Sequence, residues 1–267
     1  MTFRSELDVA CRLALAAGAS ARSYQAGSIE VGMKDAGEIV TPADLEADRI
    51  IIAGLRAAFP DDALFTEESP DSPARLTASR VWIVDPIDST SDFARGGDEY
   101  TVSIGLAVDG AATVGAVYNP GRDELFAGVV GQGMTLNGQP ARVSNASELA
   151  TAQVSVSRKE WSRGITTLSS VALIPISSMA YKLARVAAGL DDGAVSVRAR
   201  KEWGTCAGCA LVVAGGGMAR LLDGGAVYFN RSEAKQASGM VAAGPGLVDA
   251  LRDAVASAGP ERDTPRV

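Results

Sequence analysis

Apolar positions along the first sixty residues recur at the spacing of amphipathic helices. The pattern predicts helices over residues 5–26 and 42–59, the second with Pro42 in its first turn and Thr41 as its cap. Two short apolar runs follow, Ala63–Thr66 and Val81–Val84. Their length and flanking residues predict strands, the second one buried.

The pattern changes near residues 145–151. Before this point, β-rich runs at 101–109, 112–118 and 124–130, with an Asn-Gly turn inside 136–140, predict an antiparallel meander. After it, strands and helices alternate. The expected strands are 152–157, 171–176 and 193–198, and the expected helices are 177–190, 203–215 and one from Pro245. We therefore expect an α/β protein with two halves, 1–148 and 149–267, that share an interface.

Composition narrows the possible functions. A chain that is 47% hydrophobic can fill a core, which excludes disorder as its main state. The net charge of −7 disfavours a nucleic acid polymer as partner, because phosphate neutralisation needs a basic patch. The sequence contains no histidine, which excludes Ser-His-Asp and Cys-His catalysis and every His-ligated zinc site. Any chemistry must use carboxylates, hydroxyls, amines, thiols or a bound metal.

Cysteine usage and the N-terminus indicate the compartment. Cys11, Cys206 and Cys209 are too few to predict a secreted disulfide framework. Cys206 and Cys209 share one face of an expected apolar helix, which favours core packing over redox or metal chemistry. The N-terminus lacks the features of a signal peptide, and no apolar run is long enough to cross a membrane. We expect a cytoplasmic protein without a membrane span.

The segment VWIVDPIDSTSDF, residues 81–93, carries the strongest chemical signal. Its apolar strand delivers Asp85 and Asp88 at the carboxyl end, and Pro86 prevents the strand from simply continuing. Ser89 and Thr90 can then open a helix. Two carboxylates beside a helix N-terminus favour a hard cation together with an anion. The alternative is a surface turn with a helix cap.

Further carboxylates reinforce the first interpretation. Glu67 and Glu68 end the strand-like ALFTEES, and Asp44 lies near the start of the second helix. Taken singly, the glutamates could be solvated and Asp44 could interact with the helix dipole. Together they supply oxygen ligands that suit Mg²⁺, with Mn²⁺ as the alternative, and no nitrogen or thiolate ligand that favours zinc.

These residues resemble the motifs of the inositol monophosphatase family, in order and spacing, over nearly the whole chain. The matching segments are VTPAD at 40–44, EES at 67–69, WIVDPIDST at 82–90 and KEWGTCAG at 201–208. The segments at 175–196 and 228–247 lean toward the bacterial branch that includes 3′(2′),5′-bisphosphate nucleotidases. The resemblance implies a layered αβαβα sandwich of the inositol monophosphatase/fructose-1,6-bisphosphatase type. It also implies a homodimer and Mg²⁺-assisted hydrolysis of a phosphorylated small molecule.

The resemblance also implies roles for individual residues. Glu67, Asp85 and the carbonyl of Ile87 would hold one metal, and Asp85 would bridge to a second metal that it shares with Asp88. Thr90, hydrogen-bonded to Asp44, would orient or deprotonate the nucleophilic water. The backbone amides of Ser89 and Thr90 would bind phosphate. Lys34 lies where relatives place a lysine near the metals, although a solvated lysine is equally consistent with the sequence.

The chain departs from the family pattern at positions that bear on function. Gly204 follows Trp203 at an expected helix start where the family has an Asp that completes the second metal site. Ser89 and Ser177 replace usual glycines, and Val197 stands where the inositol enzymes carry an acidic sugar-binding residue. We expect Ser177, Ser178 and Gly204 to line the substrate pocket.

Three interpretations follow from these departures. The protein is an active phosphatase with a weakened second metal, a divergent enzyme acting on a biosynthetic intermediate, or a binding protein for a phosphorylated ligand. Retention of all the expected catalytic and metal-binding side chains favours metal chemistry. The retained side chains are Asp44, Glu67, Asp85, Asp88 and Thr90.

Overall fold

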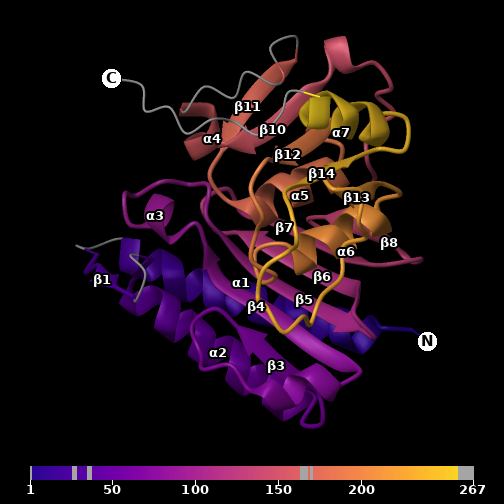
Figure 1. The fold of residues 1–267 in the computed structure, drawn as a ribbon. Coiled ribbons are helices and arrows are strands. Elements are labelled where there is room, and N and C mark those ends of the chain that lie inside the picture. Colours follow the sequence, from indigo (N-terminus) through magenta and orange to yellow (C-terminus); the bar gives the residue numbers. More distant parts are fainter. Residues whose placement is uncertain (1, 26–28, 35–37, 163–167, 169–170, 258–267) are drawn as a thin grey trace.

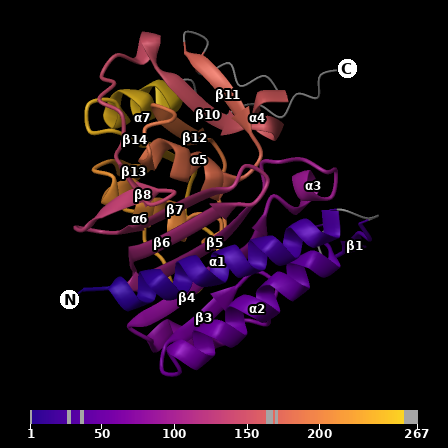
Figure 2. The same ribbon diagram turned by 180° about the vertical axis from the view of Figure 1, so that it is seen from behind.

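The computed structural model describes residues 2–25, 29–34, 38–162, 168 and 171–257. Its first layer is a pair of helices, α1 (Arg4–Gln25) and α2 (Pro42–Ala58), which pack on each other and on one face of a sheet (Figures 1 and 2). Both predicted helices are confirmed, although residue 26 lies outside the described residues. Thr41 stands at the N-cap of α2, where its N–H and hydroxyl donate to the Asp44 carboxylate at 2.8 and 2.6 Å.

The second layer is a seven-stranded sheet in which the strands follow chain order. β3 and β4 are parallel, and all later neighbours are antiparallel, which confirms the predicted meander. The strands are β3 (Ala63–Thr66), β4 (Arg80–Asp88), β5 (Thr101–Val108), β6 (Ala111–Asn119), β7 (Glu124–Val129), β8 (Gly133–Leu136) and β9 (Gln139–Ala141). β4 extends beyond its expected end, but its register with β5 shifts between Asp85 and Asp88, because Pro86 has no N–H to donate.

The third layer, α5 (Met179–Ala187) and α6 (Cys206–Ala214), lies between the two sheets (Figure 1). A Cβ on Gly105 of β5 would lie 2.7 Å from the amide nitrogen of Ala207, so this glycine allows α6 to approach the sheet closely. Both helices are shorter than predicted. Ser178 caps α5 by accepting the N–H of Tyr181, and residues 203–205 form a turn before α6.

The remaining layers belong to the C-terminal part of the chain. A five-stranded sheet has the order β11-β10-β12-β14-β13, with β10 parallel to both of its neighbours. Its strands are β10 (Gln153–Ser157), β11 (Ala172–Ile176), β12 (Gly193–Ser196), β13 (Met218–Leu221) and β14 (Met240–Ala243). α7 (Val248–Ser257) packs on its outer face, and α4 (Arg158–Ser162) follows β10. The last helix starts after its predicted Pro245 because residues 245–247 form a turn.

The layering confirms the predicted αβαβα sandwich. Apolar residues from both parts of the chain form one cluster around α5 and α6, so the division into 1–148 and 149–267 stays a prediction. The short elements are β1 (Gly32–Met33), β2 (Ile39–Val40), α3 (Thr90–Phe93) and the 3₁₀ turns Pro73–Thr77 and Leu149–Thr151. Within the described ranges, no helix is long and apolar enough to cross a membrane.

Cys206 and Cys209 lie in α6 as free, buried thiols among apolar side chains, as core packing requires. Burial raises the pKa of the Cys209 thiol to about 12, raises the pKa of Cys206 well above its usual value, and raises the pKa of Cys11 to about 11. Because the thiolate is the reactive form, all three thiols should react slowly in the folded protein.

We therefore expect native protein treated with iodoacetamide at mildly alkaline pH to keep its mass. The same protein in guanidinium chloride should take up one adduct on each of its three cysteines. Intact-mass spectrometry measures both results. Rapid native labelling of Cys206 or Cys209 would contradict the core-packing role and reopen a redox function for the pair.

Candidate active site

The fold brings the predicted acidic residues to one edge of the seven-stranded sheet. Because β3 and β4 are parallel, their carboxyl ends lie side by side, with Glu67 just after β3 and Asp85 and Asp88 at the end of β4. The first turn of α2 adds Asp44. Residues that are up to 44 positions apart therefore face the same space, which their sequence spacing alone does not ensure.

Asp44 and Thr90 form the predicted hydrogen-bonded pair. The Thr90 hydroxyl lies 2.9 Å from Asp44 Oδ1 and 3.2 Å from the carbonyl oxygen of Ile87. Asp44 is fully buried, and this burial raises its pKa, while hydrogen bonds from Thr41 and Thr90 favour the charged form. The Asp44 carboxylate is thus positioned to receive the Thr90 proton in a hydrogen bond and to orient the hydroxyl oxygen.

Asp85 has a buried carboxylate oxygen that makes no hydrogen bond to the residues that the structure describes. This atom is Oδ1, and the residue as a whole is buried. Burial raises the pKa of Asp85 well above its usual value, and the nearby carboxylates of Glu67, Asp88 and Asp44 raise it further. A buried anion among anions is costly unless a cation compensates it. The chemistry of this group of oxygens fits Mg²⁺ or Mn²⁺.

Lys34 compensates part of this charge. Its Nζ atom lies 3.3 Å from Glu67 Oε1 and 2.6 Å from Glu68 Oε1, so the lysine faces the carboxylates and is not simply solvated. Burial nevertheless raises the pKa of Glu68 to about 7. In the described part of the chain, no three acidic or thiol side chains converge into a ready-made cation site. Glu67 would have to share its carboxylate between Lys34 and a cation.

Asp88 is held from the C-terminal part of the chain. Its Oδ2 atom accepts hydrogen bonds from the Ser178 hydroxyl and the Ala180 N–H, both at 2.6 Å. Ser178 is fully buried, so its side chain supports Asp88 and does not line an open pocket as the sequence predicts. Ser177 is only half-buried, and its hydroxyl donates to Asp92 at 3.2 Å.

Gly204 faces the same two carboxylates. A Cβ at this position would lie 3.8 Å from Asp85 Oδ2 and 3.8 Å from Asp88 Oδ1. A side chain at this position would therefore point directly at the predicted second metal site. Gly204 lies in the turn before α6, which begins at Cys206, and so it does not stand at the helix start as the sequence predicts.

The predicted helix after Asp88 is a single turn. α3 spans only Thr90–Phe93, so its dipole is too small to attract phosphate strongly. The local amides of Ser89 and Thr90 remain the predicted phosphate donors of this turn. Ser89 adopts the left-handed conformation, with φ of 80° and ψ of 52°. This conformation favours glycine, because a Cβ there is crowded by the backbone.

We expect Ser89→Gly to raise the free energy of unfolding of the metal-free protein by about 1 kcal/mol, the typical strain of a left-handed non-glycine residue. Ser91→Gly is a matched control, because Ser91 is exposed and helical in α3 and should lose about 0.5 kcal/mol. Chemical denaturation measures both. Equal destabilisation by the two variants would contradict strain at Ser89.

Sequence reasoning missed several charged residues around this edge. Lys182 of α5 is fully buried, and its Nζ atom has no hydrogen-bond partner within the described part of the chain. Burial lowers the pKa of Lys182 to about 7. Lys182 follows Ser178 by four residues, so the sequence could have placed both side chains on the same face of the predicted helix. Glu99 and Arg158 form a bidentate ion pair across 59 residues, for which the sequence offers no motif.

Comparison with known proteins places this geometry in a family. The model of the inositol monophosphatase family matches residues 4–256. Histidinol-phosphatase from Chlorobaculum parvum is 35% identical over 79% of this chain and 73% of its own length. Nus factor SuhB from Pasteurella multocida is 31% identical over 91% and 92% of the two chains, and inositol monophosphatase 2 from Solanum lycopersicum is 33% identical over 79% and 85%.

Solved structures of family members have the same fold as this chain. The extragenic suppressor protein suhB from Bartonella henselae superposes with a TM-score of 0.83 at 26% identity, covering 94% of this chain and 98% of its own. Inositol monophosphatase from Anabaena gives 0.82 at 27% identity, covering 96% and 97%. None of these relatives is named as a bisphosphate nucleotidase, so that branch stays a prediction. The predicted family is confirmed: this chain belongs to the inositol monophosphatase family.

Proposed function

We propose that this protein hydrolyses phosphate monoesters of small molecules with the help of Mg²⁺ or Mn²⁺. The observation that carries the proposal is the buried Oδ1 atom of Asp85, which has no hydrogen-bond partner in the described ranges and lies near the carboxylates of Glu67 and Asp88. These oxygens fit a hard divalent cation, and the names of the family and of two relatives are those of phosphatases.

The residues of the candidate active site have separate roles in the proposed reaction. Glu67, Asp85, Asp88 and the carbonyl of Ile87 would hold the cation. When bound, it would neutralise phosphoryl charge and lower the pKa of a bound water. Thr90 directs its oxygen toward the attacking water, because its hydroxyl donates its proton to Asp44 Oδ1, 2.9 Å from the hydroxyl oxygen. The amides of Ser89 and Thr90 orient the phosphate. Lys34 limits the negative charge that the phosphate would otherwise meet.

The substrate is a small phosphorylated molecule, such as a sugar phosphate, a nucleoside phosphate or a biosynthetic intermediate. Val197, which replaces the acidic sugar-binding residue of the inositol enzymes, argues against myo-inositol phosphate. A homodimer and a cytoplasmic location are further predictions from the family resemblance.

A second candidate function is ligand binding without hydrolysis. The specific observation in its favour is Gly204, which leaves Asp85 and Asp88 without a third carboxylate on that side. In this case the pocket would retain phosphate affinity but would release no inorganic phosphate.

Phosphate release distinguishes the two candidates. We expect turnover of at least one member of a panel containing histidinol phosphate, inositol monophosphates, hexose phosphates and nucleotides, with activity that EDTA abolishes and Mg²⁺ restores. The matched control is Asp85→Asn, which keeps the side-chain shape but removes the central charge. Phosphate binding measured by calorimetry with no turnover of the panel would favour the binding role.

A further inference from the structure

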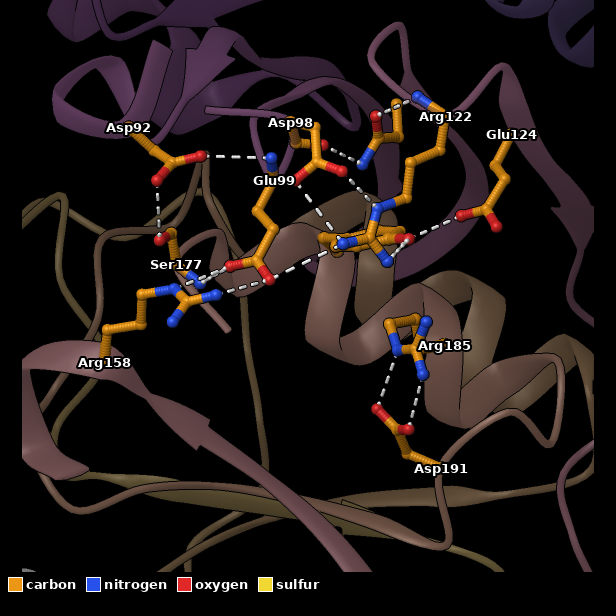
Figure 3. A network of polar contacts seen from close by, with 11 residues as sticks. Asp92, Asp98, Glu99, Arg122, Glu124, Arg158, Ser177, Arg185 and Asp191 are labelled. Atoms are coloured by element: carbon orange, nitrogen blue, oxygen red, sulfur yellow. Dashed lines mark hydrogen bonds and ion pairs between the residues drawn. The ribbon is translucent and has the colours of Figure 1, made fainter. Parts of the chain in front are cut away.

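A polar cluster joins the segment after the acidic motif to the start of α5 (Figure 3). We name it the seam latch and define it as Asp92, Glu99, Arg158 and Ser177. Asp92 and Glu99 come from the N-terminal part of the chain, in and after α3, whereas Arg158 opens α4 and Ser177 precedes α5. The seam latch therefore spans the two parts of the chain beside the candidate active site.

Asp92 forms one side of the seam latch. Its Oδ2 atom accepts the N–H of Glu99 at 3.0 Å, and its Oδ1 atom accepts the Ser177 hydroxyl at 3.2 Å. One carboxylate thus orders the loop that follows α3 and also contacts the residue that leads into α5. A glycine has no side chain to make the second contact, which gives the Ser177 replacement of the usual glycine a structural consequence.

Glu99 forms the other side. Its buried carboxylate accepts the Ser177 N–H at 3.0 Å and two N–H groups of Arg158, from Nε and Nη2, at 2.9 and 2.8 Å. Arg122 approaches the same carboxylate at 3.7 Å. Ser177 is therefore held at its backbone by Glu99 and at its side chain by Asp92, which leaves the start of α5 little freedom to shift.

The start of α5 supplies two hydrogen bonds to the Asp88 carboxylate. Ser178 and Ala180, which follow Ser177 closely, are the residues that donate to Asp88 Oδ2. Gly204 supplies no carboxylate to the predicted second metal site, so Asp88 carries more of that site than it does in relatives with the Asp. A displacement of α5 would thus act on the metal through Asp88.

We propose that Glu99 is a positioning residue, which through Ser177 sets the donors that orient Asp88 for the second cation. The proposal rests on the proposed function, because it assigns a metal to Asp88. Glu99 itself would touch neither the substrate nor the cation. Loss of an outer partner of a metal ligand typically lowers metal affinity by 10–100-fold, and we expect about 10-fold here.

The chain offers a matched control at the opposite end of α5. Arg185 donates to Asp191 through a bidentate pair at 2.9 and 2.8 Å, the same chemistry as Arg158 and Glu99 (Figure 3). The Arg185–Asp191 pair makes no contact with Ser177, Ser178 or Asp88 in the described hydrogen bonds. Asp191→Ala should therefore lower stability as Glu99→Ala does, and leave the metal site unchanged.

The experiment uses the full chain and compares Glu99→Ala, Ser177→Ala and Asp191→Ala. The first readout is amide hydrogen exchange over residues 176–183 in metal-free protein, which reports on the start of α5 without any cation. The second is Mn²⁺ binding followed by the electron paramagnetic resonance signal of free Mn²⁺. A further variant, Glu99→Gln, keeps an acceptor for the Ser177 N–H and should recover part of the affinity that alanine loses.

We expect Glu99→Ala to speed exchange over 176–183 and to weaken the looser Mn²⁺ site by about 10-fold. Ser177→Ala should have the same effects more weakly, with a several-fold loss of Mn²⁺ affinity. Asp191→Ala should change neither. If both seam-latch variants match Asp191→Ala in exchange and in Mn²⁺ affinity, the positioning role is overturned. If Glu99→Ala does not fold, the comparison of Ser177→Ala with Asp191→Ala decides the question. If the native chain binds no Mn²⁺, the proposed function fails. Faster exchange in Glu99→Ala than in Asp191→Ala would then still support the hold of Glu99 on the start of α5, and equal exchange would overturn it.

Discussion

Replacement of Thr90 by alanine is expected to lower turnover by about 100-fold or more, the usual effect of losing a positioned proton-transfer group. The hydroxyl that lies 2.9 Å from Asp44 would be absent, so the attacking water would lose the group proposed to orient it. Asp44→Asn should have a similar effect, because a neutral amide is a poor acceptor for the Thr90 proton. Phosphate release under saturating substrate measures both variants.

The affinity for Mg²⁺ should change far less than the turnover in both variants. Neither side chain is assigned as a direct ligand, so we expect the Mg²⁺ activation constant to stay within a few-fold of the native value. Thr90→Ser is the matched control, because it keeps the hydroxyl and should keep most of the activity. Native turnover in Thr90→Ala and Asp44→Asn together would remove the proposed role of this pair.

Gly204→Asp is expected to tighten the weaker metal site by about 10-fold or more and to raise phosphatase activity. Its Cβ atom would lie 3.8 Å from both Asp85 Oδ2 and Asp88 Oδ1, within reach for its carboxylate to share their cation. A direct ligand should matter at least as much as an outer partner, whose loss alone costs 10–100-fold. Mg²⁺ titration of activity and Mn²⁺ binding measure the change.

The stability of the same variant provides an independent test. Without metal, a third carboxylate beside Asp85 and Asp88 adds repulsion, and we expect a loss of about 1–3 kcal/mol in the free energy of unfolding. Mg²⁺ at about 100 times its dissociation constant would return about 2.7 kcal/mol. Gly204→Asn is the matched control, with similar shape and no charge. A Mg²⁺ response in Gly204→Asp that equals the native response would favour the divergent or binding-only interpretations.

The sequence by itself determined the local features of this protein. Helical spacing located α1 and α2, and alternation with turn residues located the meander of β5 to β7, because both patterns depend on neighbours a few positions apart. The DPIDST motif and its flanking acids identified the edge of the sheet where chemistry is expected. The absence of histidine was enough to exclude histidine general bases and His-ligated zinc, because those mechanisms require an imidazole.

Only the tertiary structure decided how these residues meet. Ser178 reaches Asp88 across 90 residues, Lys34 reaches Glu67 across 33, and Gly204 faces two carboxylates more than a hundred residues earlier. Short-range patterns contain no record of such contacts, because they arise when α5 and α6 pack between two sheets. The left-handed backbone of Ser89 and the burial of Lys182, whose Nζ atom has no hydrogen-bond partner in the part of the chain described, are likewise products of packing. The motif therefore indicates which residues can act, whereas packing decides which partners hold them.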